Sequence, residues 1–129
     1  GSFAIVEGCG AHGCEYMTGG TAIILGSVGD NFGAGMTGGM AFIYDQKNEF
    51  ENFANPASII WQPVETDFWK KFLKESIESF ETKTSSQKAK RILNNFELEL
   101  KNFKQVCPIE MLDKLDNPIS LKAYTKKAG

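Results

Sequence analysis

The sequence predicts a mainly β fold, a right-handed parallel β-helix of about three coils followed by a two-helix carboxyl-terminal extension. The first observation is a repeat: Met17-Thr18-Gly19-Gly20 and Met36-Thr37-Gly38-Gly39 are identical and lie 19 residues apart. The second is a change of composition, because twelve of the 13 glycines lie between Gly1 and Gly39. A fixed period with one short apolar run per repeat is typical of a solenoid in which each repeat forms one coil.

Three short apolar runs recur with this period and are the expected strands: Phe3–Val6, Thr21–Leu25 and Met40–Tyr44. Each run is too short for a helix, and its nearly continuous apolar or β-branched composition suits parallel strands that are covered on both faces. The 19-residue period also aligns one isoleucine per coil. We expect Ile5, Ile24 and Ile43 to form one ladder that points into the core.

The glycines of the repeat are interpreted as backbone positions rather than ligand contacts. Stacked coils turn corners that require a positive φ or a close approach of two backbones, and a Cβ would hinder both. The structural repeat positions are Gly10, Gly19, Gly20, Gly26, Gly29, Gly33, Gly38 and Gly39.

The chain is expected to divide into five parts. Residues 1–2 have the sequence of a scar left by tag removal, 3–47 form the solenoid, 48–63 a linker with a short strand, 64–107 amphipathic helices, and 108–129 a tail. The short strand is Ser58–Gln62, which Pro63 ends.

Two helices are predicted from apolar residues at helical spacing. The first begins at Glu65 and carries apolar residues at Phe68, Phe72 and Ile77. The second begins after a capping-box pattern, Thr84 followed three residues later by Gln87, and extends to Cys107. Its apolar residues are Ala89, Ile92, Leu93, Phe96, Leu100 and Phe103. The charged residues Glu65, Asp67 and Glu97 are interpreted as solvated or capping charges rather than a catalytic pair.

Composition excludes several classes of function. The net charge is −2, and neither half of the chain has the basic stripe of a nucleic-acid binder. No apolar run approaches the roughly 20 residues that span a bilayer. Three cysteines without a secretion signal indicate free thiols, so we expect a cytoplasmic or organelle-interior location, without secretion.

One glycine motif suggests a dinucleotide site. Gly8-Cys9-Gly10-Ala11-His12-Gly13 fits G-x-G-x-x-G, and Asp30 follows at about the expected distance. The fingerprint requires a helix to open at these glycines, whereas a second glycine pair and the run Thr21–Leu25 follow instead. Gly33–Gly38 fits the same pattern and fails for the same reason.

A cluster of Cys9, His12 and Cys14 suggests a metal site or a thiol nucleophile. Structural zinc requires four ligands, and the third cysteine, Cys107, lies far along the chain. A Cys14–His12 nucleophilic pair lacks a recognisable third member. Small buried thiols in a glycine-rich corner are the favoured interpretation, so no catalytic, cofactor or metal residue is assigned.

The glycine-rich stretches Val6–Gly20 and Asn31–Phe42 closely resemble the carboxyl-terminal glycine-repeat domain of the glutamate synthase large subunit. The family repeat, G-x-x-G-x-x-x-G, is present at Gly26, Gly29 and Gly33. Phe103–Pro108 also resembles the end of that subunit. Related β-helix subunits of formylmethanofuran dehydrogenase share the coil pattern and are one alternative, and an independent nucleotide-binding module using Gly8–Gly13 is another.

The resemblance implies a structural role. Glutamate synthases transfer the amide nitrogen of glutamine to 2-oxoglutarate and reduce the product to glutamate, and they use FMN and an iron–sulfur cluster held by other domains. No catalytic or cofactor-binding residue of those domains has a counterpart here. The implied function is a non-catalytic β-helix scaffold that contacts the other domains of the large subunit. Because an uncovered first coil would leave a strand edge open, we also expect the chain to self-associate as a dimer.

Overall fold

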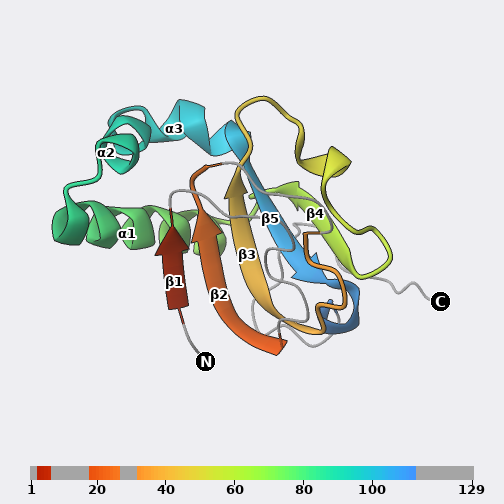
Figure 1. Cartoon of the computed structure of the whole chain (residues 1–129). Helices are drawn as coiled ribbons and strands as arrows, with labels where there is room; N and C mark the ends of the chain where they lie inside the picture. Colours follow the sequence, from red (N-terminus) through yellow and green to blue (C-terminus); the bar gives the residue numbers. More distant parts are fainter. Residues whose placement is uncertain (1–2, 7–17, 27–31, 113–129) are drawn as a thin grey trace.

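The structure is a computed structural model that describes residues 3–6, 18–26 and 32–112, which form a five-stranded mixed sheet with helices on one face (Figure 1). The strands lie in the order β1-β2-β3-β5-β4. Their bounds are β1 Phe3–Val6, β2 Thr18–Ile24, β3 Gly38–Tyr44, β4 Ile59–Pro63 and β5 Phe103–Pro108. The helices are α1 Asp67–Thr84, α2 Gln87–Asn94 and α3 Phe96–Glu99, with single 3₁₀ turns η1 Phe50–Asn52, η2 Leu100–Asn102 and η3 Ile109–Met111.

The three strands of the repeat pair in parallel, β1 with β2 and β2 with β3. Ala22 stands opposite both Ala4 and Ala41, so from Thr21 to Ile24 the paired positions lie 18 residues apart towards β1 and 19 towards β3. The register shifts between Thr18 and Thr21. This irregularity includes Gly20, whose φ is 85° and therefore lies in the region that favours glycine.

The β-helix prediction is wrong, because the sheet does not continue as parallel coils. β5 pairs antiparallel with β3, and β4 pairs antiparallel with β5. The described residues thus form an open, mixed sheet, and the fold is a small mixed α/β arrangement. The 19-residue period predicts the parallel pairing of three strands. It does not predict that residues 103–108, which lie outside the repeat, pair with the third of them.

The predicted isoleucine ladder is correct for two of its three members. Ile24 stands opposite Ile43, whereas Ile5 stands opposite Ile23 because β1 is offset by 18 residues. Side chains alternate between the faces of a strand, so a shift of one residue moves a side chain to the other face. Ile5 consequently packs with the core on the helix face, and Ile24 and Ile43 belong to the core on the opposite face.

The second helix is shorter than predicted. α2 ends at Asn94, and residues 103–108, expected to be helical as far as Cys107, form strand β5, which lies between β3 and β4. The spacing of Phe96, Leu100 and Phe103 also fits a helix, which is why the pattern is ambiguous. The side chains of this segment point to the two faces of the sheet, as in a strand. Phe103 and Cys107 belong to the core on the helix side, whereas Val106 belongs to the core on the opposite side. The short strand before Pro63 is confirmed as β4.

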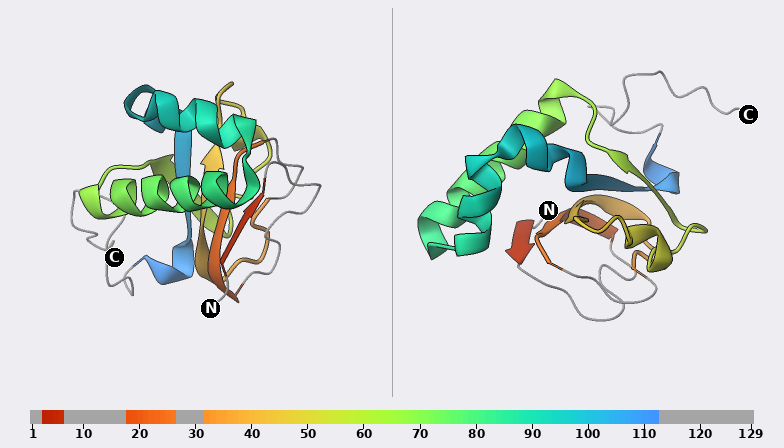
Figure 2. Two further views of the ribbon diagram at one scale, coloured as in Figure 1. Left: turned by 90° about the vertical axis from the view of Figure 1, so that its left-hand side faces the viewer. Right: turned by 90° about the horizontal axis from the view of Figure 1, so that it is seen from above.

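Two hydrophobic cores lie on the two faces of the sheet. The view from above in Figure 2 shows α1 and α2 on one side of the sheet and η1 on the other. On the helix side, Phe42 contacts Trp69 and Phe72 of α1, with ring centroids 5.9 and 5.8 Å apart. On the other side, Phe50 contacts Phe32 and Trp61 edge to face. β3 is therefore covered on both faces, as its apolar sequence predicts.

Local signals explain where the helices begin. The Thr66 side chain accepts a hydrogen bond from the backbone N–H of Trp69 and caps α1. The cap of α2 is Ser86, which accepts from the N–H of Ala89 at 3.2 Å, and not Thr84 as the capping-box pattern predicts. Between the two helices, Ser85 adopts a left-handed conformation with φ 56°, so the chain reverses within two residues.

Candidate functional site

A concave site among the described residues lies beside the carboxyl ends of the parallel strands β2 and β3. A cavity of about 250 Å³, open on one side, is lined there by the end of β3, by α2 and by Asn95 and Glu99 at the two ends of α3. A second cavity of about 180 Å³ shares Tyr44, Gln46 and Lys88 with it and extends towards Gly26. The carboxyl ends of parallel strands are a common location for ligands in α/β proteins. The first cavity is lined by Tyr44, Gln46, Lys88, Arg91, Ile92, Asn94, Asn95 and Glu99.

Tyr44, the last residue of β3, forms the floor of the cavity. Its hydroxyl donates a hydrogen bond to Oε1 of Glu99, and Nδ2 of Asn102 donates to the same oxygen at 3.0 Å. Burial, followed by the hydrogen bond to Glu99 and the negative charge of that carboxylate, raises the pKa of Tyr44 from 10.0 to about 12. The tyrosine is therefore a neutral hydrogen-bond donor at physiological pH, and not a base or nucleophile.

Two basic side chains of α2 lie beside this tyrosine. Nζ of Lys88 lies 5.9 Å from the centroid of the Tyr44 ring, within the range of a cation–π contact. Arg91 lies one helical turn further along the same face of α2 and lines the same cavity. Neither cation forms an ion pair with any residue in the part of the chain that the structure describes.

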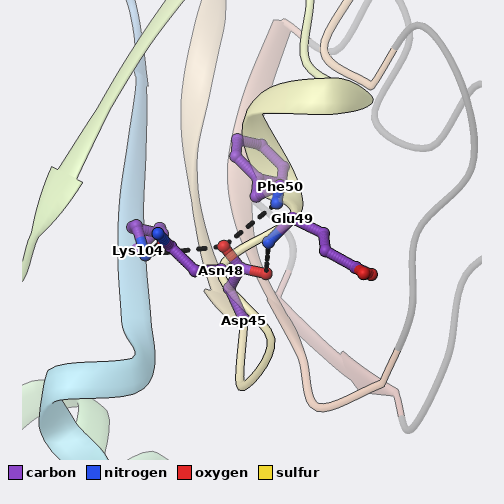
Figure 3. Close-up of polar contacts among 5 residues, drawn as sticks. All are labelled: Asp45, Asn48, Glu49, Phe50 and Lys104. Carbon is purple, nitrogen blue, oxygen red and sulfur yellow. Dashed lines mark hydrogen bonds and ion pairs between the residues drawn. The ribbon is translucent and has the colours of Figure 1, made fainter.

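Asp45 organises the loop that follows β3 (Figure 3). One carboxylate oxygen accepts from the backbone N–H of Glu49 at 2.8 Å, and the other accepts from the N–H of Phe50 at 3.0 Å. Lys104 of β5 lies 3.4 Å from Asp45 and donates to Oδ1 of Asn48 at 2.9 Å. These contacts attach the loop to β5, so the carboxylate has a structural role and is not available to substrates.

Several of the sequence-predicted sites lie outside the described residues. These are Gly8–Gly13 with its cysteine and histidine, Cys14, Asp30, Gly10 and Gly29. The interpretation of the Cys9, His12 and Cys14 cluster therefore stays a prediction. Among the residues that are described, no three His, Cys, Asp or Glu side chains lie close enough to hold a metal ion.

Cys107, the one cysteine that is described, is fully buried in β5. Burial raises the pKa of its thiol from 9.0 to about 12. Since the thiolate is the reactive form, Cys107 is a core residue without nucleophilic character.

The described repeat glycines differ in their surroundings. Gly20, Gly33 and Gly39 have positive φ values of 85°, 77° and 86°. A Cβ on Gly33 would lie 2.8 Å from Cδ1 of Ile59, whereas a Cβ on Gly19 would have no neighbour within 4 Å. These glycines form no phosphate-binding turn at the start of a helix, since Gly20 and Gly39 lie within strands.

Sequence reasoning missed the cavity above Tyr44. Its residues come from the end of β3 and the loop after it, and from α2 and α3, which lie about 40 to 55 residues further along the chain. Asp45 follows a buried apolar strand directly, a position at which a short polar side chain often caps the next turn, but it does not line this cavity. The cationic pair on α2 has the ordinary pattern of a solvated helix face.

In the structure the glycine repeat corresponds to the parallel strands β1, β2 and β3, with positive φ values at Gly20 and Gly39. The chain belongs to the GXGXG motif family, whose family model matches residues 1–109.

Three relatives of this chain are glutamate synthases. The chain is 50% identical over 121 residues to the glutamate synthase [NADPH] large chain of Azospirillum brasilense, and 41% identical over 127 residues to the glutamate synthase [NADH] of Schizosaccharomyces pombe. It is 44% identical over 106 residues to the ferredoxin-dependent glutamate synthase of Antithamnion sp.. The matches cover 94%, 98% and 82% of this chain, but only 8%, 6% and 7% of those relatives. The resemblance to glutamate synthase is confirmed.

None of the described helices combines the length and the apolar composition that a membrane span requires.

Proposed function

We propose that the chain acts as a non-catalytic structural module of a glutamate synthase large chain. The observation that carries this proposal is that nearly the whole of this chain matches a small part of a longer relative. At 50% identity, 94% of this chain aligns with 8% of the Azospirillum brasilense large chain. In that relative the matching segment is one part of a much longer polypeptide. The parent would transfer the amide nitrogen of glutamine to 2-oxoglutarate and reduce the product to glutamate.

The arrangement of polar groups supports a structural role. The Tyr44 hydroxyl and the Glu99 carboxylate bond each other, and Asp45 bonds two backbone N–H groups and Lys104. Groups used in this way hold the strand ends and the helices together. They are not positioned as an acid–base or nucleophilic pair.

Exposed apolar side chains supply surfaces that other parts of a large chain would cover. Phe68 at the start of α1 is 50% exposed, Leu98 of α3 is 66% exposed and Ile109 is 42% exposed. Scattered single residues of this kind need no special explanation on a monomer. In a segment of a longer chain they are natural contacts for neighbouring domains, which we propose as its partners.

Cofactors are proposed to lie elsewhere in the parent. FMN and an iron–sulfur cluster are expected in other domains of the large chain, and this module is proposed to hold neither. An independent nucleotide-binding module would instead use Gly8–Gly13, which lies outside the described residues. The formylmethanofuran dehydrogenase alternative rested on a β-helix coil pattern. The sheet of this chain is open and mixed, so this alternative has no support from the fold.

A graft experiment tests the structural role. This chain would replace the matching segment of the Azospirillum brasilense large chain, and a second graft would carry Asp45→Ala to weaken the loop anchor. We expect the first graft to retain glutamine-dependent glutamate synthesis, and the second to lose thermal stability while each folded molecule keeps its FMN. A titration of the isolated chain with FMN is the control. Stoichiometric FMN binding by the isolated chain, or a fully folded Asp45→Ala graft without FMN, would contradict the proposal.

Self-association of the isolated chain stays a prediction. Sedimentation velocity over a range of concentrations measures it directly. We expect a dimer at high concentration, and a single monomeric species throughout would show that this expectation is wrong.

A further inference from the structure

We propose that the cavity above Tyr44 binds a small oxygen-rich anion that carries phosphate or carboxylate groups. This inference goes beyond the structural role and does not depend on it. It rests on the charges, the hydrogen-bond donors and the volume of the cavity, which are considered in turn.

The positive charge of the cavity comes from α2. Lys88 and Arg91 are three residues apart, so their side chains neighbour each other on one face of the helix. Both line the cavity, and within the described ranges neither is neutralised by an ion pair. An arginine can donate two parallel hydrogen bonds to a carboxylate or phosphate, and a lysine adds a point charge. The pair is suited to the oxygens of an anion.

Neutral donors surround the two cations. Gln46 follows the end of β3, and Asn94 and Asn95 lie at the end of α2. Each side-chain amide has two N–H donors. No hydrogen bond joins these three amides to another side chain in the described part of the molecule. They are therefore available to orient a ligand that Lys88 and Arg91 attract.

The single acidic residue of the lining is already engaged. Oε1 of Glu99 accepts hydrogen bonds from the Tyr44 hydroxyl and from Nδ2 of Asn102. Lys88 and Arg91 outnumber this carboxylate, so the lining carries a net positive charge. One carboxylate beside two cations cannot hold a metal ion, which requires several oxygen ligands. The site therefore discriminates in favour of small anions.

The floor of the cavity strengthens these interactions. Ile92 is 2% exposed and Tyr44 is 9% exposed, and both belong to the hydrophobic core on the helix side, so the cavity borders that core on one side. Electrostatic attraction is stronger where water is partly excluded. A volume of about 250 Å³ admits phosphate or a small dicarboxylate.

Nuclear magnetic resonance titration of the full chain tests the proposal. Sodium phosphate and sodium malonate are added in separate series at constant ionic strength, which sodium chloride maintains. We expect saturable shifts of the amide signals of Gln46, Lys88 and Arg91. Saturation with phosphate alone identifies a phosphate-bearing ligand, saturation with malonate alone a carboxylate, and saturation with both a general anion site. If neither series saturates at these residues, the proposal is overturned.

Matched variants separate a built site from diffuse attraction. Arg91→Gln should weaken binding about tenfold, the effect expected for the loss of one charge-assisted interaction. Lys90→Gln removes the same charge from an exposed residue of α2 that does not line the cavity and should leave binding unchanged. Glu99→Gln keeps an oxygen for the Tyr44 hydroxyl and should tighten binding. Equal losses in Arg91→Gln and Lys90→Gln, with urea curves showing both folded, would refute the site.

Discussion

Gly33→Ala should destabilise the protein by about 2–5 kcal/mol. The φ of Gly33 is 77°, and an L side chain in this left-handed region costs about 1–2 kcal/mol. The added Cβ would also lie 2.8 Å from Cδ1 and 3.1 Å from Cγ2 of Ile59, a buried residue of β4. Overpacking of this kind typically adds about 1–3 kcal/mol. Urea denaturation followed by tryptophan fluorescence measures the change in the free energy of unfolding.

Gly19→Ala is the matched control for this substitution. Gly19 belongs to the same repeat, but a Cβ there would meet nothing within 4 Å and its φ is not positive. We expect no loss of stability, since alanine reduces the entropy of the unfolded chain. Ile59→Val removes Cδ1 and should relieve part of the cost in the Gly33→Ala background, leaving the backbone penalty. Equal stabilities of Gly33→Ala and Gly19→Ala would refute the reasoning.

Four further outcomes are expected from denaturation measurements. Burial raises the pKa of Cys107 from 9.0 to about 12, so its stabilisation is complete below pH 9 and is lost at about 1.4 kcal/mol per pH unit above it. Cys107→Ala should lack the decline between pH 9 and 10, before Tyr44, whose pKa is raised from 10.0 to about 12, adds a decline of its own. Ile24→Ala should cost about 2–5 kcal/mol, and Ile5→Ala, which is only half-buried, clearly less. Asp45→Ala removes two backbone caps and an ion pair and should cost about 1–2 kcal/mol. Gln105→Met should stabilise by about 1 kcal/mol, because Oε1 of this buried side chain has no partner among the described residues.

The sequence predicts those features that depend on neighbours in the chain. The repeat predicts three parallel strands, and the amphipathic pattern after Glu65 predicts α1. The one-residue difference between the two parallel registers, 18 residues for β1 with β2 and 19 for β2 with β3, is not visible in the repeat, which has a single period of 19. The candidate cavity could not be predicted, since its walls come from segments that only the tertiary structure brings together.

The misassigned strand β5 explains how the parallel repeat ends. Three parallel strands leave the outer edge of β3 with unpaired backbone groups, which would recruit another chain. β5 pairs with this edge from Ala41 to Tyr44, although it lies about 60 residues further along the sequence. β4 then covers β5, and its own last residue is Pro63, which cannot donate a backbone hydrogen bond to a further strand. A repeat protein needs a terminal unit that departs from the repeat. In this chain the antiparallel strand β5 is that terminal unit. A fourth parallel strand in its place would again have had an unpaired edge.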